Sequence, residues 1–328
     1  MKLKHDVLVL GSQNSKEQDQ ELSRDQIRPV QILSKNGELK AIDFFNSWGS
    51  VGVSSFASHP EFKDELFVSV NEEIRRLNLI TGEYNTLDIT KLADIHDINF
   101  LGDTLWISNT EFDEAVEYDI RKNELVKRIS LAEYRVDVNE LEGEAEDIKD
   151  QFHCNQVFRD YEGNLCVLIH NITGWQYFRI VLEMLIRKQG DGGVINLDEK
   201  EVLKLKLQSP HSVRKINNEY WIQDSSDKTT KIFDRNWKLK SSILTNGFGR
   251  GVDFSEEDGV AYIGISATRK RYLKVIPAGG KLDNRIMVVD ISTKKEIQLI
   301  SIPNIEQMDN VYILDQEFKT KLEKLDEL

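Results

Sequence analysis

The stretch Ile74-Arg-Arg-Leu-Asn-Leu-Ile-Thr-Gly-Glu-Tyr84 decides the fold, because units of this kind recur along the chain. It predicts a β-hairpin, in which a polar turn separates two short strands. Five further stretches follow the same pattern: Val30–Leu39, Val116–Leu125, Val194–Val202, Lys231–Leu239 and Ile286–Ile297. Internal repeats of short supersecondary units are typical of propellers and solenoids.

A second hairpin precedes most copies of the first. It runs from a polar residue through a strand and a turn to an aromatic strand, as in His96–Trp106, His211–Trp221 and Arg250–Tyr262. Two consecutive hairpins make a four-stranded sheet, which is the blade of a β-propeller. One blade alone cannot bury both of its faces, so we expect the blades to stack in a ring.

The inner strands predict an all-β fold, a six-bladed β-propeller. They begin near Ser50, His96, His153, His211, Arg250 and Glu306. The last blade is short of strands, and we expect the N-terminal segments to complete it and so close the ring without exposed sheet edges. These segments are Val7–Leu10, Val30–Leu33 and Leu39–Phe44. A β-sandwich with additions is the alternative architecture.

Three segments do not follow the repeat. Residues 175–188 carry apolar side chains at helical spacing, which predicts one helical insertion, either docked on a rim or folded over the cavity as a lid. Residues 131–150 are acidic and are predicted to form a loop. The charged segment 316–328 is predicted to be a short, solvated C-terminal helix that follows a single propeller domain over residues 1–315.

The composition is that of an acidic globular chain. The 43 Lys and Arg against 56 Asp and Glu leave a net charge of −13, which argues against a broad nucleic-acid surface. No apolar run approaches the roughly 20 residues of a membrane helix, and the run from Val7 to Leu10 is too short for a signal peptide. Cys154 and Cys166 form no disulfide framework or zinc cluster. We therefore expect a cytoplasmic protein that binds neither nucleic acid nor membranes.

Three histidines are candidates for chemistry, because the first residues of the inner strands converge at one mouth of a propeller channel. His96, His153 and His211 are 57 and then 58 residues apart. Three neutral imidazoles from three blades suit a divalent transition metal such as Zn, Mn, Fe or Ni. A repeat also keeps polar residues at equivalent positions for structural hydrogen bonds, and a metal that only staples the ring is a third interpretation.

Other polar residues are expected to complete this site. Glu306 is predicted to be a fourth metal ligand or the general base. Arg250 stands among glycines, which allow a close approach of the backbone, and its guanidinium suits a carboxylate or phosphate group. An ion pair between blades, with Glu306 or Asp253, is the alternative role for Arg250. Three further residues are predicted to contact the substrate: Asn155, Trp106 and Trp221.

A series of short motifs resembles an uncharacterised bacterial family of propeller-like proteins. The motifs are Asp94-Ile-His-Asp-Ile98, Leu105-Trp-Ile-Ser-Asn-Thr110, His153-Cys-Asn155, Gly174-Trp175, Asp191-Gly-Gly193, Pro210-His-Ser212 and Gly247-Phe-Gly-Arg-Gly251. The resemblance implies a six-bladed propeller that is distantly similar to propellers of the streptogramin-lyase and gluconolactonase type. It also implies a divalent metal at the channel mouth, as in those relatives.

These observations predict a metal-dependent lyase, isomerase or lactonase-type hydrolase. Its substrate would be a small anionic molecule, such as a sugar-acid-like compound or a natural product, bound at the channel mouth. His96, His153, His211 and Glu306 would hold the metal, and Arg250 would bind the anionic group. The alternative is a non-catalytic propeller that binds a ligand or a protein partner on one rim.

Overall fold

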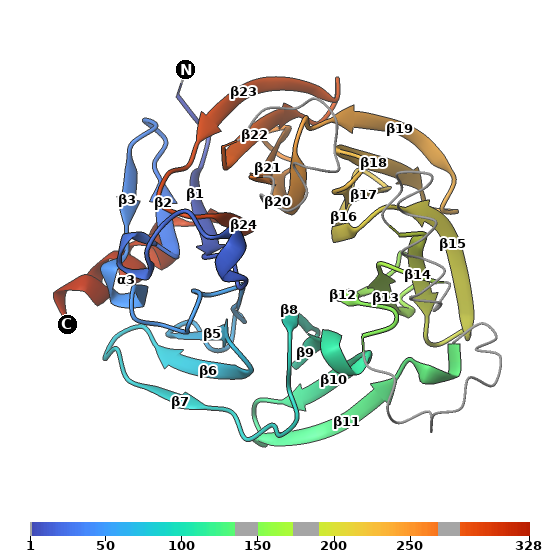
Figure 1. Cartoon of the computed structure of the whole chain (residues 1–328), viewed down its shortest axis with the longest axis horizontal. Coiled ribbons are helices and arrows are strands. Elements are labelled where there is room, and N and C mark those ends of the chain that lie inside the picture. Colours follow the sequence, from blue (N-terminus) through green and yellow to red (C-terminus); the bar gives the residue numbers. More distant parts are fainter. Residues whose placement is uncertain (1, 135–149, 173–189, 268–282) are drawn as a thin grey trace.

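Six four-stranded antiparallel sheets stand in a ring around a central axis (Figure 1). The computed structural model describes residues 2–134, 150–172, 190–267 and 283–328. The arrangement confirms the predicted six-bladed propeller. The expected helical insertion at 175–188 lies outside the described residues, as does most of the acidic segment 131–150.

Each blade runs from an inner strand at the channel to an outer strand at the rim. The first blade holds β4 (Ser55–Ala57), β5 (Glu65–Val70), β6 (Glu73–Asn78) and β7 (Tyr84–Thr86). The second holds β8 (Ile95–Leu101), β9 (Thr104–Asn109), β10 (Glu114–Asp119) and β11 (Glu124–Ser130). The third holds β12 (Cys154–Arg159), β13 (Leu165–Ile169), β14 (Gly192–Asn196) and β15 (Glu201–Leu207).

The remaining blades follow the same order. The fourth holds β16 (Pro210–Ile216), β17 (Glu219–Asp224), β18 (Thr229–Asp234) and β19 (Leu239–Leu244). The fifth holds β20 (Phe248–Ser255), β21 (Val260–Ser266), β22 (Arg285–Asp290) and β23 (Lys295–Ser301). The sixth holds β24 (Gln307–Leu314), β1 (Asp6–Ser12), β2 (Val30–Leu33) and β3 (Leu39–Ala41).

The two ends of the chain close the ring, as predicted. In the sixth blade β24 pairs antiparallel with β1 from Asp6–Leu314 to Ser12–Gln307, and β2 and β3 follow on the outside. The third N-terminal strand is shorter than expected, because the chain leaves the sheet after Ala41 and makes a 3₁₀ turn over Asp43–Phe45. This pairing provides hydrogen-bond partners for the backbone groups that the edge strands of an open ring would expose.

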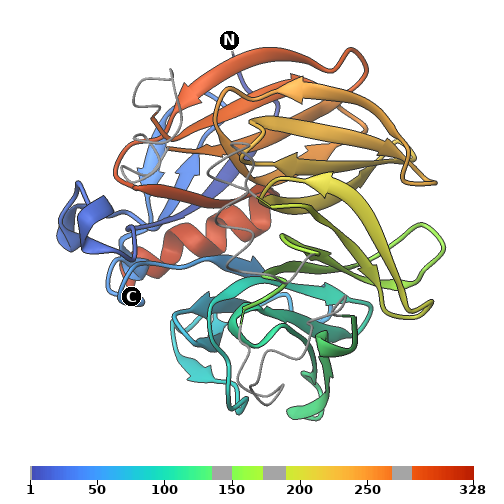
Figure 2. The same ribbon diagram turned by 45° about the vertical axis from the view of Figure 1, so that its right-hand side comes forward.

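The C-terminal helix α3 (Gln316–Lys324) begins where Asp315 caps it, accepting a hydrogen bond from the backbone N–H of Phe318 at 2.7 Å. The expected solvated helix is instead docked against the ring (Figure 2), because Leu322 and Leu325 are buried in the core of the first and sixth blades. In the part of the chain that the structure describes, no helix is long and apolar enough to span a bilayer.

Candidate site in the central channel

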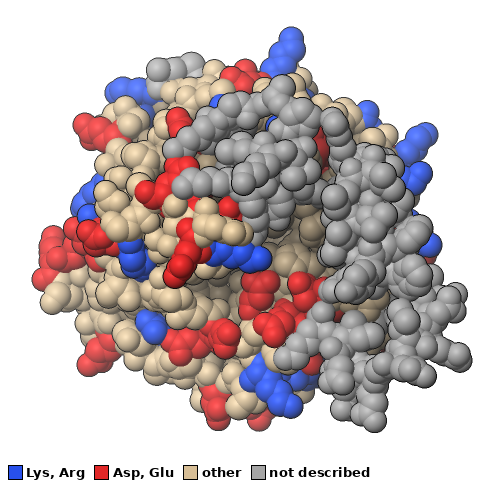
Figure 3. Space-filling view, in the orientation of Figure 1, with Lys and Arg blue, Asp and Glu red and all other residues tan. Residues whose placement is uncertain are grey.

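A cavity of about 200 Å³ opens at one end of the channel. All six blades line it with polar residues at or near the start of their inner strands, among them Ser54, His96, Asn155, His211, Arg250 and Asp309. Acidic and basic side chains also lie close together around the middle of the face seen in Figure 3. The channel therefore brings together groups from segments that are far apart in the sequence.

β-bulges set the direction of these side chains. The strand register shifts at residues 95–98 in β8, 154–156 in β12, 211–213 in β16, 249–252 in β20 and 308–310 in β24. A bulge leaves an extra residue without a pairing partner and re-aims side chains. The polar residues that face the cavity lie at or beside these bulges.

The three predicted histidines do meet in the channel. The ring centroids of His96 and His153 are 4.6 Å apart, and those of His96 and His211 are 6.2 Å apart. A fourth ring, that of His170 at the end of β13, lies 5.5 Å from His153. The imidazoles form a connected cluster, whereas their spacing in the sequence only suggested it.

The near-even spacing of the histidines hides a difference in register. The first strand pairs of the three hairpins are Ile95–Asn109, Cys154–Ile169 and Pro210–Asp224. Asn155 therefore follows in the position that His96 and His211 occupy in their blades. His153 stands two residues earlier, in the position of Asp94, and both have left-handed backbone, with φ of 51° and 50°. His153 reaches the cluster from the loop that precedes its strand.

Hydrogen bonds fix the tautomers of His96 and His211. His96 Nδ1 lies 3.1 Å from the carbonyl oxygen of Asp94 and 3.1 Å from the hydroxyl of Thr110. His211 Nδ1 lies 2.9 Å from the carbonyl oxygen of Ser209. Because a carbonyl oxygen only accepts, each Nδ1 carries the proton and donates it. Nε2 of both rings therefore carries the lone pair that a ligand can use.

His153 is held in the same way by acidic side chains. Its Nδ1 donates to Asp150 Oδ1 at 2.7 Å. The backbone N–H of His153 and those of the two preceding residues donate to the carboxylate of Asp113, at 2.7–3.1 Å. A hydrogen bond from one ring nitrogen to a carboxylate or carbonyl oxygen is the usual support of a metal-binding histidine. Nε2 of His153 is again the nitrogen left for a ligand.

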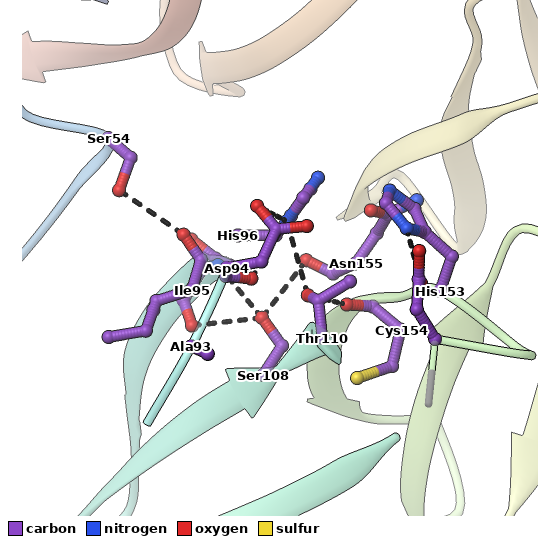
Figure 4. Close-up of polar contacts among 12 residues, drawn as sticks. Ser54, Ala93, Asp94, Ile95, His96, Ser108, Thr110, His153, Cys154 and Asn155 are labelled. Atoms are coloured by element: carbon purple, nitrogen blue, oxygen red, sulfur yellow. Dashed lines mark hydrogen bonds and ion pairs between the residues drawn. The ribbon is translucent and has the colours of Figure 1, made fainter. Parts of the chain in front are cut away.

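A candidate metal centre follows from this arrangement. Asp94, His96 and His153 each offer one nitrogen or oxygen donor, and these three atoms lie within 4.8 Å of one another (Figure 4). Imidazole and carboxylate together suit Zn, Mn, Fe or Ni. Asn155 beside them is only 3% exposed, yet its Oδ1 accepts no hydrogen bond within the described chain. A buried acceptor without a partner is costly, so it supports a bound ligand here.

The electrostatics of the channel keep the imidazoles of His96 and His211 neutral. Burial, with smaller contributions from the nearby His153 and Arg250, lowers the pKa of His96 to about 4 against the opposing charge of Asp94. Burial and then the charge of Arg250 hold the pKa of His211 well below its usual value. Neutral imidazole is the form that binds a metal ion or accepts a proton.

Arg250 lies near the start of the inner strand β20. It lines the cavity, and its guanidinium carbon is 5.4 Å from the ring centroid of Phe248. Its charge reaches His96 and His211, whose pKa values it lowers. The cavity therefore combines the neutral imidazoles of His96 and His211 with the guanidinium cation of Arg250. This cation suits a carboxylate or phosphate group.

Glu306 does not line this cavity. Its carboxylate is buried and accepts backbone hydrogen bonds from the N-terminal segment: from Asn14 at 2.8 Å, from Leu22 at 2.6 Å and from Glu21. The sixth blade instead contributes Asp309, three residues later, at its bulge. The structure thus places Glu306 as an anchor for the segment before β2 and not beside the histidines.

Trp106 and Trp221 also lie away from the cavity. They are 2% and 0% exposed and pack into the apolar layers between blades. Both belong to the second strand of a blade, where side chains alternate between the two neighbouring blades. The equivalence of the two positions reflects packing, and substrate contact by either indole is not supported.

Sequence reasoning missed Asp94 and Asp309 and left His170 undecided. Asp94 stands two residues before His96, so a carboxylate next to a predicted ligand was an available signal. His170 ends β13, and its Nε2 lies 2.9 Å from the hydroxyl of Ser209. No signal in the sequence separates Asp309 from Glu306, because the bulge that turns it inward is visible only in the strand pairing.

The fold and the channel define a six-bladed propeller with a histidine-lined central site. Residues 184–321 match a family model described as a domain of unknown function, DUF4915. Over this part of the chain, the resemblance to an uncharacterised family is confirmed. No curated protein matches the sequence.

Solved structures share the fold at low sequence identity. A nidogen/laminin complex is 12% identical, with 93% of this chain and 97% of that chain covered and a TM-score of 0.57. A protein of unknown function from Bacteroides caccae is 12% identical, with 94% and 97% covered and a TM-score of 0.54. A streptogramin B lyase is 12% identical, with 77% and 70% covered and a TM-score of 0.49. These likenesses concern the fold alone, and the lyase carries no argument about activity.

Proposed function

We propose that Asp94 and His96, which line the channel cavity, bind a divalent transition metal together with the adjacent His153. The chain would be a metal-dependent lyase or lactonase-type hydrolase acting on a small anionic molecule. The observation that carries this proposal is the approach of three donor atoms to within 4.8 Å of one another from two neighbouring blades. Scaffold hydrogen bonds at Nδ1 leave Nε2 of both histidines available for the metal.

The metal would supply Lewis acidity at a carbonyl or carboxyl oxygen. Arg250 would bind the anionic group of the substrate as a bidentate fork and so orient it in the cavity. His211 would accept a proton at Nε2, because its Nδ1–H is committed to the carbonyl oxygen of Ser209. Asn155 would accept a hydrogen bond from a substrate hydroxyl at its buried Oδ1.

A non-catalytic ligand-binding propeller is the alternative, since the same cavity would bind an anionic molecule without converting it. Glu306 has no part in either function, because backbone N–H groups of the N-terminal segment already occupy its carboxylate. The cytoplasmic location stays a prediction, in keeping with the buried free thiols of Cys154 and Cys166.

Turnover of a defined panel tests the proposal. The protein is loaded with Zn, Mn, Fe or Ni and incubated with small lactones and with sugar acids that carry a leaving group β to the carboxylate. Products are followed by mass spectrometry. We expect His211→Gln to lower kcat and Arg250→Gln to raise KM. His5→Gln is the control and leaves both unchanged, because the His5 ring pairs with Asp258 in the turn between β20 and β21 and neither residue lines the cavity.

Two results would count against a metal-dependent enzyme. Turnover that persists after chelation and in His96→Ala would remove the metal from the reaction. Saturable binding of a panel member to the metal-loaded protein, with no product from any member, would favour the non-catalytic alternative.

A further inference from the structure

We propose a second ligand site at the other end of the channel, which takes a small monocarboxylate with an apolar body. This inference goes beyond the metal site and does not depend on it. The site is a cavity of about 730 Å³, a volume within the usual range for small-molecule pockets. Its walls come from β4, β8, β16, β20, β24 and α3.

The second cavity follows from the two-residue period of the inner strands. Side chains two positions apart face the same side of a strand. Ser212 and Asn310 line the first cavity, and Arg214 and Tyr312, two residues further on, line the second. Each inner strand thus carries channel-facing groups towards both ends of the ring.

A hydrogen-bonded pair forms the common wall of the two cavities. Asp97 and Gln156 line both, and Gln156 Nε2 donates to Asp97 Oδ2 at 2.9 Å. Gln156 Oε1 accepts a further bond from the backbone N–H of Val213 at 2.5 Å. Both side chains are buried and engaged on both of their polar atoms. They lie between the polar residues of the first cavity and the lining of the second.

Arg214 is a cationic group of the second cavity with open hydrogen-bonding capacity. Within the described chain its guanidinium makes a single hydrogen bond, from Nη1 to the carbonyl oxygen of Val213 at 3.0 Å, and no ion pair. Burial raises the pKa values of the neighbouring carboxylates of Asp97 and Asp253, and the charge of Arg214 acts on both to lower them. Their hydrogen bonds within the described chain, however, come from neutral donors. Asp97 Oδ1 accepts from Ser55 at 2.8 Å, and Asp253 Oδ2 accepts from the backbone N–H of Ile313 at 2.7 Å. Arg214 therefore retains donors for a bidentate carboxylate.

Aromatic side chains line part of the cavity, beside the charged residues Lys63, Asp315, Glu317 and Lys321. Phe56, Phe62, Phe100 and Phe318 come from four different segments. Phe62, Phe100 and Phe318 are only half-buried, so a ligand that covered them would gain apolar burial. One carboxylate on Arg214 and an aryl or branched alkyl body against the phenyl rings would complement this lining.

Calorimetric titration with a defined set of probes tests the site. The probes are 3-phenylpropanoate, isovalerate, the amide 3-phenylpropanamide and acetate, added to chelator-treated protein. We expect 3-phenylpropanoate to bind about tenfold or more tightly than its amide, because a hydrogen bond to a charged group is lost in the amide. Acetate, which lacks the apolar body, should bind weakest.

Variants assign the binding to this cavity. Arg214→Gln should weaken 3-phenylpropanoate about tenfold or more, whereas Arg250→Gln, the matched change in the first cavity, should leave it unchanged. The proposal is overturned if no probe binds, if the amide binds as well as the acid, or if Arg250→Gln is the variant that loses binding. The acid-to-amide comparison uses the unaltered protein, so it decides the matter even if Arg214→Gln fails to fold. Chelation keeps the result separate from that of the metal site.

Discussion

His96 and His153 stand edge to face in the channel with ring centroids 4.6 Å apart, although 57 residues separate them in the sequence. They come from neighbouring blades, and each is held through Nδ1, His96 by the carbonyl oxygen of Asp94 and His153 by Asp150. Both rings are therefore acceptors at Nε2 and cannot hydrogen bond to each other. A cation shared between them would satisfy both lone pairs, which is why a metal centre is the interpretation we favour.

The support of His153 by Asp113 predicts a loss of metal affinity in Asp113→Asn. The amide would turn a donor towards backbone N–H groups that now donate to the carboxylate, and His153 would move. We expect metal affinity to fall about 10–100-fold and the free energy of unfolding by about 1–3 kcal/mol. Metal titration and urea denaturation measure the two effects.

Asp119→Asn is the control for this change. Asp119 lies in the same blade, and its carboxylate also accepts backbone N–H bonds, at a turn far from the cavity. It should lower stability at most and leave metal affinity intact. Equal metal affinity in the two variants would show that Asp113 does not position His153.

The anchoring role of Glu306 predicts a stability effect without a metal effect. Glu306→Gln keeps the shape of the side chain but replaces one accepting oxygen by a donor that faces backbone N–H groups. We expect the free energy of unfolding to fall by about 1–3 kcal/mol and the segment before β2 to become sensitive to proteases. Loss of bound metal in Glu306→Gln would restore the ligand role that the sequence suggested.

Burial of Trp221 predicts that Trp221→Phe acts on packing alone. The indole is fully buried between the fourth and fifth blades. The smaller ring leaves a cavity, and we expect a loss of about 1–3 kcal/mol in the free energy of unfolding. Affinity for an anionic ligand, measured by calorimetry, should not change. A selective loss of that affinity in a normally stable variant would contradict this account.

Most of the fold follows from the sequence because hairpin signals are local. The turn Thr81-Gly82 between the strands Glu73–Asn78 and Tyr84–Thr86 is visible in a short window, and so is each of its counterparts. Closure by the N-terminal strands follows from counting strands. The docking of α3 does not follow, because its charged face is evident in the sequence while the surface that buries Leu322 comes from the two ends of the chain.

The site follows less well, since one inserted residue in a strand turns a different side chain inward. Even spacing predicted His153 and Glu306 at equivalent positions, whereas the bulges place Asn155 and Asp309 there. His153 still reaches the cluster through its left-handed backbone at φ 51°, which spacing does not reveal. The end of the channel that carries the polar side chains was predictable. Which residue of each inner strand faces the channel there was not.

Asp224 predicts a pH dependence of stability. Burial raises its pKa from 3.8 to about 6, against the opposing charge of Lys231 at 2.5 Å. The folded protein then binds this proton more tightly than the unfolded chain, so the contribution is present below pH ~4 and is lost as the pH rises through ~6. As the pH rises between these values, the free energy of unfolding of Asp224→Asn should increase by up to about 3 kcal/mol relative to that of the unaltered protein.

Urea denaturation across this pH range measures the effect. Asp227→Asn is the control, because Asp227 also contacts Lys231, at 3.1 Å, but is partly exposed. The free energy of unfolding of Asp227→Asn should change with pH in the same way as that of the unaltered protein. A constant difference between Asp224→Asn and the unaltered protein at every pH would show that Asp224 is ionised throughout.

The most direct test of the metal centre is elemental analysis of protein purified without a polyhistidine tag or chelator, beside His96→Ala, His153→Ala and the control His5→Ala. We expect a transition metal at close to one per chain in the unaltered protein and the control, and its loss in both channel variants. Absence of metal from the unaltered protein, with no tight uptake of added Zn, Mn, Fe or Ni, would contradict the proposed metal centre.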